Sequence, residues 1–504
     1  MKSLFKTVAL ITIFSVITRF LGFVFRIYLS RKLGAEYLGL FQVASSVIGI
    51  MLTLVSSGLP LSTAKFVAKY EAENRQKNKK AVVGASLIIA ISLSAILCLL
   101  IFVGQNLFTH IFADDRAIKL MVIMLPAVFF SSIYCVFRGA MWGKNDYFSV
   151  CITEFIEQVA RIVITVILLA SLTSKYDFSI GTAQCFSIAC TISAILSVFI
   201  YFKKDGKILF KKGEYKNILR SSAPVTGVRV TSSFIQPLSA IIIPAQLISI
   251  GYTSSQAMSA YGVMMGMVFP LLFIPMAVIG SLGMVLIPNI AGLMSQNNYD
   301  KIASQVKNSI QTSIFCSAIF IPLYLGVGDL IGVVLYDNVL SGVLLQISAI
   351  IVVPIALCNI TSSMLNALNL EVKSFKNYLA GAIAMFASMF LLTKSMGINS
   401  IILGLFLCMS IVALLNIRML NKKLPGLQLK IVKTLCKYSL ICLPCALLAY
   451  LSESIFLHFL PVFVSCTLGG IIGISMCLIL LNTFNIFKVA QVMRFKRRKL
   501  RTSP

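Results

Sequence analysis

Two arginines lie inside the first long apolar stretch of the chain. Arg19 and Arg26 occur within residues 4–31, which are otherwise largely apolar. In a helix, a spacing of seven residues places both side chains on one face. A charge inside a membrane span is costly and marks a functional candidate, and the planar fork of arginine suits a phosphate group. This face therefore predicts a site for a phosphorylated anion.

Two further apolar stretches, 37–64 and 218–249, carry polar stripes of the same kind. The second stretch also contains three prolines, each of which removes a backbone donor and favours a kink. We expect the stripes of all three stretches to line one polar cavity. The residues that stand out at helical spacing are Gln42 and Thr53 in the first stretch, and Arg229, Ser233 and Gln236 in the second.

A cluster of opposite charges lies on one side of the stretch 148–172. Glu157 and Arg161 are four residues apart, the spacing of an ion pair along a helix. Glu154 has no basic partner in its own helix. Two interpretations stay open: a structural ion pair, or a site where these three residues couple transport to a proton or another cation.

The sequence predicts neither a metal site nor a cofactor site. It has only two histidines, and most of its 13 cysteines lie in apolar runs, where cysteine behaves as a small hydrophobic residue. The pair Cys442 and Cys445 has redox-motif spacing but lies in an apolar helix rather than beside a βαβ pattern. No phosphate-binding loop of the form GxxxxGK[ST] is present.

The composition requires a membrane. The 504 residues are 58% hydrophobic and 12% charged, whereas soluble domains carry roughly 25% charged residues. The apolar runs are long and continuous, which favours helices over a β-barrel. At ~20 residues per span we expect about fourteen spans. Their ranges are 4–31, 37–64, 81–105, 118–142, 148–172, 180–202, 218–249, 257–290, 303–327, 340–367, 373–394, 398–420, 434–452 and 459–483.

The net charge of +28 comes mainly from the connections between apolar stretches, which argues against a nucleic-acid site. Lys and Arg residues gather in alternate connections, chiefly 65–80, 203–220 and 418–437, and in the tail 488–501. The positive-inside rule then places the N- and C-termini in the cytoplasm and the chain in the cytoplasmic membrane. The first span continues past its arginines without a cleavage site, so we expect it to be retained.

A weak internal repeat at an offset of 223 residues pairs the second span with the eighth. Chance similarity between apolar helices is the alternative. The repeat predicts an all-α protein with two six-helix lobes and two additional helices at the C-terminus. The predicted divisions are 1–202 (N-lobe), 203–217 (basic cytoplasmic linker), 218–420 (C-lobe), 434–483 (two spans) and 484–504 (basic cytoplasmic tail).

Several short motifs stand out in order along the chain: 19–26 (RFLGFVFR), 31–42 (RKLGAEYLGLFQ), 57–68 (SGLPLSTAKFVA), 223–226 (APVT), 261–262 (YG) and 269–275 (FPLLFIP). Together they resemble one family of transporters, the stage V sporulation protein B and polysaccharide transporter branch of the multidrug/oligosaccharidyl-lipid/polysaccharide flippase superfamily. The resemblance implies a V-shaped, two-lobed fold that moves lipid-linked sugars by alternating access. It also matches Arg19 and Arg26 to cavity arginines of the lipid II flippases. Spans 2 and 8 lack arginines found in those flippases.

The expected function is therefore that of a flippase, not an enzyme, for an undecaprenyl-pyrophosphate-linked peptidoglycan precursor, with the spore cortex as one setting. Its expected partners are this anionic lipid, membrane lipids, and a coupling ion or the membrane potential, with the chain a monomer. The expected ligands are Arg19, Arg26 and Arg229 for the pyrophosphate and Gln42, Thr53, Ser233 and Gln236 for the sugar.

Three alternatives stay open. A flippase for capsular or other surface polysaccharide differs only in its saccharide. A multidrug exporter of the same fold would take cationic drugs, and the arginines argue against it. A membrane glycosyltransferase needs paired carboxylates, for which Asp114 and Asp115 are the only candidate pair.

Overall fold

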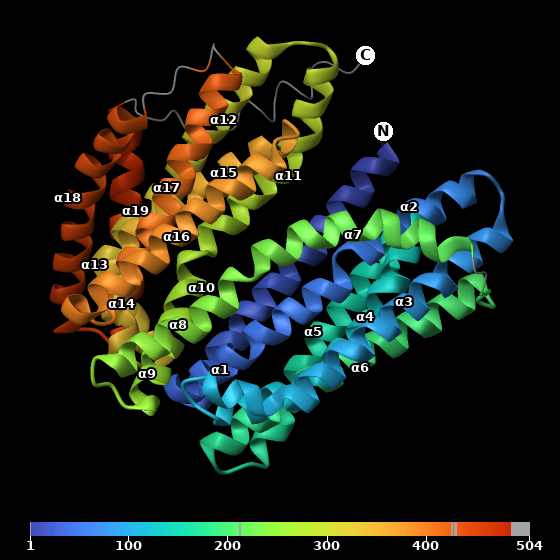
Figure 1. Ribbon diagram of the computed structural model, residues 1–504. Helices are drawn as coiled ribbons and strands as arrows, with labels where there is room; N and C mark the ends of the chain where they lie inside the picture. Colours follow the sequence, from blue (N-terminus) through green and yellow to red (C-terminus); the bar gives the residue numbers. More distant parts are fainter. Residues whose placement is uncertain (1, 211–212, 425–426, 428–430, 485–504) are drawn as a thin grey trace. The chain divides into compact units, whose positions relative to one another are not determined.

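The computed structural model describes residues 2–210, 213–424, 427 and 431–484, and these residues form helices and short connections without a strand (Figure 1). Nearly all of the predicted tail 484–504 lies outside this range. The helices are α1 (Lys2–Ser56), α2 (Gly58–Ala72), α3 (Gln76–Val103), α4 (Arg116–Gly143), α5 (Tyr147–Ala170), α6 (Lys175–Asp205), α7 (Gly213–Ser233), α8 (Ile235–Ser249), α9 (Ser254–Tyr261), α10 (Phe269–Leu272), α11 (Ile274–Ser295), α12 (Tyr299–Ala318), α13 (Phe320–Tyr336), α14 (Val339–Ser348), α15 (Val352–Ala367), α16 (Glu371–Met396), α17 (Asn399–Lys423), α18 (Ile431–Leu457) and α19 (Val462–Thr483). Two 3₁₀ turns and a π-helix at Gly262–Val268 complete the described part.

The expected all-helical membrane fold is confirmed, but the count of fourteen spans is not. The described residues contain 11 helical segments long and apolar enough to cross a membrane, or up to 12 if a bent pair is one span. One of these segments, Ile13–Ala72, is 60 residues long and contains a break at Gly34. α5 is not among these membrane-crossing segments, because Glu154, Glu157 and Arg161 interrupt its apolar sequence.

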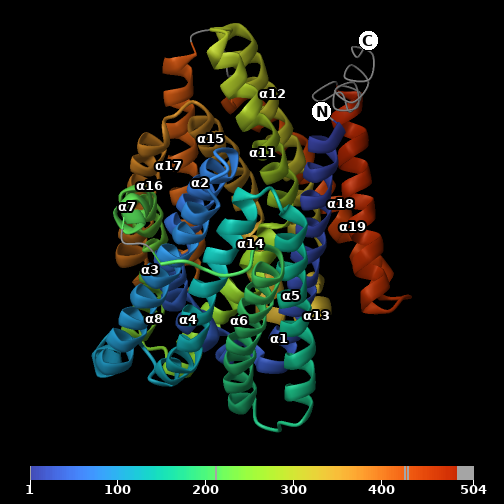
Figure 2. The same ribbon diagram turned by 90° about the vertical axis from the view of Figure 1, so that its right-hand side faces the viewer.

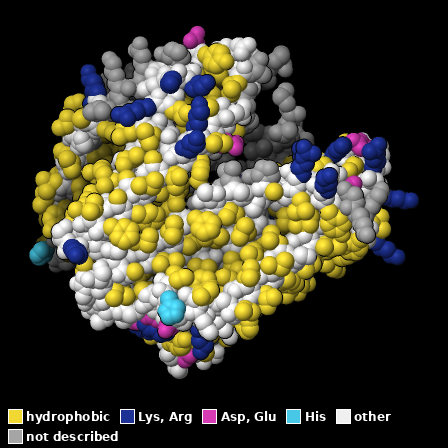
Figure 3. All heavy atoms as spheres, in the orientation of Figure 1, with side chains coloured by type: hydrophobic (Ala, Val, Ile, Leu, Met, Phe, Trp, Pro, Cys, Tyr) yellow, Lys and Arg dark blue, Asp and Glu magenta, His cyan; other side chains and the backbone are white. Residues whose placement is uncertain are grey.

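The surface agrees with a membrane protein. On the face drawn in Figure 3, hydrophobic side chains cover most of the helix sides, and Lys and Arg side chains gather near the helix ends. An apolar surface of this extent is typical of a protein surrounded by lipid.

The chain divides into two compact units, unit 1 (Met1–Gly266) and unit 2 (Met267–Pro504). Within unit 1, α1 contacts α4, α5 and α6 and also α7, α8 and α9. The boundary between the two units therefore falls some fifty residues after the end of the linker 203–217. The sequence instead predicts that the first lobe ends just before this linker. The division into two six-span lobes stays a prediction.

The predicted linker is docked rather than free. Asp205, at the end of α6, accepts salt bridges from Lys79 at 3.2 Å and Lys144 at 2.7 Å. Glu214, in the first turn of α7, is buried and accepts hydrogen bonds from Tyr70 (3.0 Å) and Asn78 (3.3 Å). These contacts attach the start of α7 to α2 and α3, so α7 belongs to unit 1.

Prolines explain two helix breaks. Pro237 has no backbone N–H to donate to the carbonyl of Ser233, and its ring clashes with that carbonyl. The helix α7 therefore ends at Ser233. In the same way Pro275 follows the break at Phe273, where the segments Ser254–Leu272 and Ile274–Gly283 meet at 51°. The expected span 257–290 is therefore bent.

Unit 2 is packed through small residues. In α13, a Cβ on Gly326 would lie 2.6 Å from the Cβ of Ala449 on α18, so the two helices are in direct backbone contact there. Close approach through glycine is typical of membrane helices, where dispersion contacts replace the hydrophobic effect. α18 and α19 run side by side, as Figure 2 shows, and both contact α13.

Turns at matching positions support the internal repeat. Asn74 and Asn297, which are 223 residues apart, both have left-handed φ angles, 56° and 53°. Asn145 and Asn369 form a similar pair, with φ of 58° and 57°. Asparagine tolerates this conformation better than most residues because its side chain hydrogen-bonds locally. The two halves of the chain therefore end corresponding helices in the same way.

A tight backbone contact in unit 1 gives a stability prediction. A Cβ on Gly262 would lie 2.0 Å from the carbonyl oxygen of Ala35, and one on Gly39 would lie 2.0 Å from that of Met258. Gly262→Ala must separate α1 from the π-helix, and we expect a loss of about 1–3 kcal/mol in unfolding free energy. Thermal unfolding of the purified protein measures this loss.

The matched control is Gly49→Ala, because nothing lies within 4 Å of a Cβ at this position of α1. Alanine has the higher helix propensity, so this variant should unfold at the wild-type temperature or above it. Equal midpoints for the two variants would mean that the contact at Gly262 relaxes freely.

Candidate functional site

α1 carries the two predicted anion ligands. Arg19 and Arg26 both precede the break at Gly34, so one continuous helical segment holds them on one face. Arg19 is exposed and Arg26 is partly buried. Between them, Gly22 faces α5, where a Cβ would lie 3.6 Å from Nε2 of Gln158. Unit 1 therefore presents two guanidinium groups on one face of a largely apolar helix.

Two predicted residues from different stretches are brought together. The hydroxyl of Ser233 on α7 donates to Oγ1 of Thr53 on α1 at 3.3 Å. Arg229 is exposed and lies one helical turn before Ser233. The contact places Arg229 and Thr53 in the same part of unit 1, as the polar stripes predict.

The other two predicted sugar ligands are placed separately. Gln42 is half-buried on α1, three turns before Thr53, and Gln236 is exposed on α8. Their roles, like those of the three arginines, stay predictions.

The ion pair predicted within α5 is present. Arg161 Nη2 bonds Glu157 Oε1, and both side chains are about four-fifths buried. The guanidinium also lies over the ring of Phe186 on α6, 4.9 Å from its centroid. An aromatic face and a carboxylate together stabilise a cation that is largely shielded from water.

Glu154 has a partner that sequence reasoning missed. Arg138 on α4 places Nη1 3.4 Å from Glu154 Oε1, and the hydroxyl of Tyr134 donates to the same oxygen at 3.5 Å. Arg138 lies over the rings of Trp142 and Tyr134, at 5.0 and 5.5 Å. Because the partner comes from another helix, spacing along α5 could not reveal it.

Each carboxylate on α5 is therefore matched by an arginine. The pairs Glu157–Arg161 and Glu154–Arg138 leave this part of unit 1 electrically neutral. The arrangement favours the structural interpretation over the coupling interpretation, because a coupling carboxylate must be able to exchange its counter-ion. Ion coupling at α5 stays a prediction.

A second charged network joins α1, α4 and α9 at one end of unit 1. Arg116 donates to Asp114 Oδ2 at 2.7 Å and to Glu36 at 2.5 Å, and it lies over the ring of Tyr37. The hydroxyl of Ser254 donates to Asp114 at 3.0 Å. The candidate pair Asp114 and Asp115 is thus split, since Asp115 is exposed and Asp114 is held by its neighbours.

The network predicts a pH-dependent stability. Burial alone would raise the pKa of Asp114, but hydrogen bonds from Arg116 and Ser254 outweigh it, so the pKa is lowered. A lowered carboxyl pKa stabilises the fold fully above the unfolded value, about pH 4, and this contribution is lost as the pH falls through the folded value. Asp114→Asn should therefore lower the unfolding temperature at neutral pH, with the difference from wild type shrinking below about pH 4.

Asp115→Asn is the control, because this neighbouring exposed side chain makes no capping hydrogen bond at the start of α4. The unfolding temperatures of wild type and Asp114→Asn are measured across pH. A difference between them that stays constant with pH would contradict a lowered pKa of Asp114 as the source of the stability.

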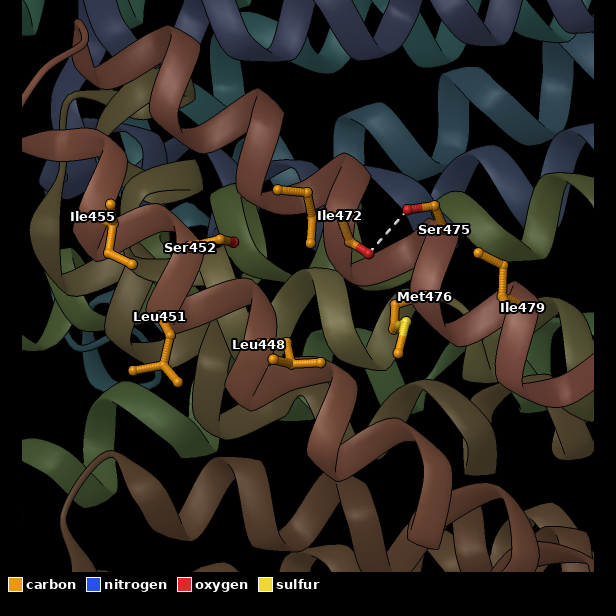
Figure 4. A pocket seen from close by; sticks show the side chains of 8 residues that line it. All are labelled: Leu448, Leu451, Ser452, Ile455, Ile472, Ser475, Met476 and Ile479. Carbon is orange, nitrogen blue, oxygen red and sulfur yellow. Dashed lines mark hydrogen bonds between the residues drawn. The ribbon is translucent and has the colours of Figure 1, made fainter.

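An apolar groove runs between α18 and α19 (Figure 4). It has a volume of about 450 Å³. The hydroxyls of Ser452 and Ser475 donate to carbonyls of their own helices, at 2.9 and 3.1 Å, so they offer little polarity to a ligand. Such a groove suits an alkyl or isoprenoid chain. Its lining residues are Leu448, Leu451, Ser452, Ile455, Ile472, Ser475, Met476 and Ile479.

This architecture, with charged and polar helix faces inside a polytopic apolar bundle, defines a multi-pass membrane transport protein. Residues 4–294, more than half of the chain, match the model of the polysaccharide biosynthesis protein family, so the chain belongs to that family.

Individual relatives agree with the family. The chain is 25% identical over 439 residues to stage V sporulation protein B of Bacillus subtilis (strain 168), covering 84% of this chain and 85% of that protein. It is 20% identical over 362 residues to the lipid II flippase MurJ of the same organism, covering 66% and 65%. The expected resemblance is confirmed.

The fold is that of a solved flippase. A structure of lipid II flippase MurJ in an inward closed conformation aligns with a TM-score of 0.71, covering 94% of this chain and 98% of that one. The identity is 15%, so this likeness concerns the fold alone.

Proposed function

We propose that this chain is a flippase for an undecaprenyl-pyrophosphate-linked saccharide of the peptidoglycan-precursor type. It would move the lipid across the cytoplasmic membrane by alternating access, with both termini in the cytoplasm. The observation that carries the proposal is the pair Arg19 and Arg26 on one face of the apolar helix α1, in a chain of the polysaccharide biosynthesis family. The similarity to a named lipid II flippase supports the substrate class.

Each part of such a lipid has a chemical counterpart. The guanidinium groups of Arg19, Arg26 and Arg229 suit the pyrophosphate, because arginine binds phosphate in a bidentate manner. Gln42, Thr53, Ser233 and Gln236 offer hydrogen bonds to the sugar. The apolar groove between α18 and α19 suits the isoprenoid chain.

The driving force follows from the charge of the substrate. A membrane potential that is negative inside favours outward movement of an anion, by about 2.3 kcal/mol per charge per 100 mV. No hydrolysis of a nucleotide is needed. The chain works as a monomer and as a transporter rather than an enzyme.

Complementation tests the proposal. A strain depleted of its lipid II flippase receives the full chain, and growth is scored at an expression level checked by immunoblot. Rescue supports a peptidoglycan precursor as substrate. A well-expressed, membrane-inserted chain that fails to rescue would contradict it and favour the second candidate, a capsular or other surface polysaccharide, which the family description also accommodates.

A further inference from the structure

Two acidic side chains of unit 2 lie in helices and belong to none of the ion pairs or polar stripes of unit 1. Glu453 on α18 is 2% exposed, and its Oε2 is buried without a hydrogen-bond partner. Asp329 on α13 is half-buried, and its Oδ1 is also buried without a partner. Buried polar atoms without partners are rare in folded proteins and call for an explanation.

The two residues lie on helices that pack against each other and against α19. A Cβ on Gly469 of α19 would lie 3.1 Å from the Cβ of Glu453 and 3.0 Å from Cγ1 of Val327 on α13. Gly326 of α13 packs on Ala449 of α18, where a Cβ on Gly326 would lie 2.6 Å from the Cβ of Ala449. Asp329 and Glu453 follow these two residues by three and four positions, about one helical turn, so both lie just beyond this contact between α13 and α18.

No basic residue neutralises this pair from the surrounding helices. α13, α14 and α19 contain no Lys or Arg. The lysines of α18 precede Glu453 by sixteen residues or more, a distance of roughly 24 Å along the helix. α14 contributes the uncharged Gln346, which packs on Gly328. The other titratable groups nearby are Tyr336 on α13 and the exposed His458, whose ring contacts the carbonyl of Ser454.

This placement favours a bound cation. Two neighbouring carboxylates without basic partners are costly to keep ionised together in a medium of low dielectric, because each opposes the charge of the other and Glu453 is shielded from water. A shared proton or a bound metal cation relieves both costs, as in pairs of carboxyl groups at other buried sites.

The helix that carries Asp329 is interrupted close to it. Val327 has non-helical angles (φ −119°, ψ 18°), so α13 is broken two residues before Asp329. At such breaks in membrane helices, carbonyl groups are released from helical hydrogen bonds and can coordinate Na⁺ or accept from a protonated acid.

We propose that Asp329 and Glu453 form a cation-uptake site that holds one monovalent cation, H⁺ or Na⁺, between their carboxyl groups at the break in α13. Occupation of the site involves unit 2 alone and does not depend on which saccharide is carried. Under the proposed function, this pair rather than the neutralised charges of α5 is the coupling site.

The position of the pair defines its route to water. Asp329 lies seven residues before the end of α13, and Glu453 lies four before the end of α18, which is roughly 10 and 6 Å. Both helices end at short turns, into α14 and α19. The shorter way to water along both helices is therefore toward these two turns.

Infrared difference spectroscopy of the full-length protein in lipid nanodiscs tests the site directly. Spectra are recorded between acidic and alkaline buffer for wild type, Glu453→Gln and Asp329→Asn. Wild type should show the C=O stretch of a protonated carboxyl, and Glu453→Gln should lose this band. In Asp329→Asn the titration midpoint of the band should move to more acidic pH, because Asp329 no longer opposes the charge of Glu453.

Asp337→Asn is the matched control. Asp337 is exposed, ends α13 in a left-handed conformation that asparagine tolerates, and has no part in the site. Its spectrum should retain the wild-type band.

A sodium series at constant ionic strength, with choline as the replacement, separates the two cations. If Na⁺ reduces the band and choline does not, Na⁺ occupies the site; if neither changes it, the site takes a proton. A wild-type spectrum without any band that Glu453→Gln removes, together with an unfolding temperature indifferent to Na⁺, would overturn the proposal. These readouts need no transport, so they test the cation site even if complementation fails.

Discussion

Alanine at Arg26 is expected to reduce rescue of a flippase-depleted strain by at least an order of magnitude at matched expression. A hydrogen bond to a charged partner contributes about 1.5–3 kcal/mol, which corresponds to roughly 10–100-fold in binding. Arg26 is partly enclosed by its helix neighbours, so less water competes for its guanidinium than at the exposed Arg19. Arg19→Ala should show the same loss with a smaller amplitude.

The side-chain chemistry can be tested with lysine. Arg26→Lys keeps the charge but loses the bidentate fork, so it should retain an intermediate activity. The control is Lys32→Ala, which removes an exposed positive charge from the same helix. If Lys32→Ala lowers rescue as much as Arg26→Ala does, the net charge of α1 matters rather than a pyrophosphate site.

Loss of Arg161 is expected to destabilise the protein by about 3–5 kcal/mol, because Arg161→Met leaves Glu157 buried without a counter-charge. Both side chains are about four-fifths buried, so solvent screens the lost interaction only weakly. The thermal midpoint of the purified protein and its yield in the membrane should both fall.

A double variant separates structure from coupling. Glu157→Gln combined with Arg161→Met removes both charges and should recover most of the lost stability. If the recovered protein also transports normally, the pair is structural. A stable double variant that has lost its response to an ion gradient would instead restore α5 as a coupling site.

The sequence predicted the helices well and their breaks less well. Long apolar runs are strong signals, so nearly every expected span overlaps a helix. The charged residues around Gly34 predicted a connection between the first two spans, and the structure has a break there, formed by one residue with a positive φ (74°) rather than by a loop of several residues. One glycine absorbs the change of direction, and no property of a hydropathy pattern reports such a local bend.

The candidate site was predictable where it depends on spacing within one helix. The pair Glu157–Arg161 follows from an interval of four residues. The partner of Glu154 does not, because Arg138 comes from α4 and the contact is tertiary.

Sequence reasoning did not single out Asp329 and Glu453, because it ended the spans that contain them too early. The expected spans 303–327 and 434–452 end just before Asp329 and Glu453, which made both acids look like loop residues. α13 and α18 continue to Tyr336 and Leu457 and enclose them. A carboxylate next to the predicted end of a span is therefore a signal that the span is longer.

The junction between the two units lies inside a helical rod. Unit 1 ends at Gly266, within the π-helix Gly262–Val268, and the chain crosses from unit 1 to unit 2 only there. A loop would be slack and would absorb movement. A helical turn instead has its backbone amides hydrogen-bonded within the turn, so it is a stiffer connection than a loop of the same length. Opening this one turn would therefore cost backbone hydrogen bonds that a loop does not have.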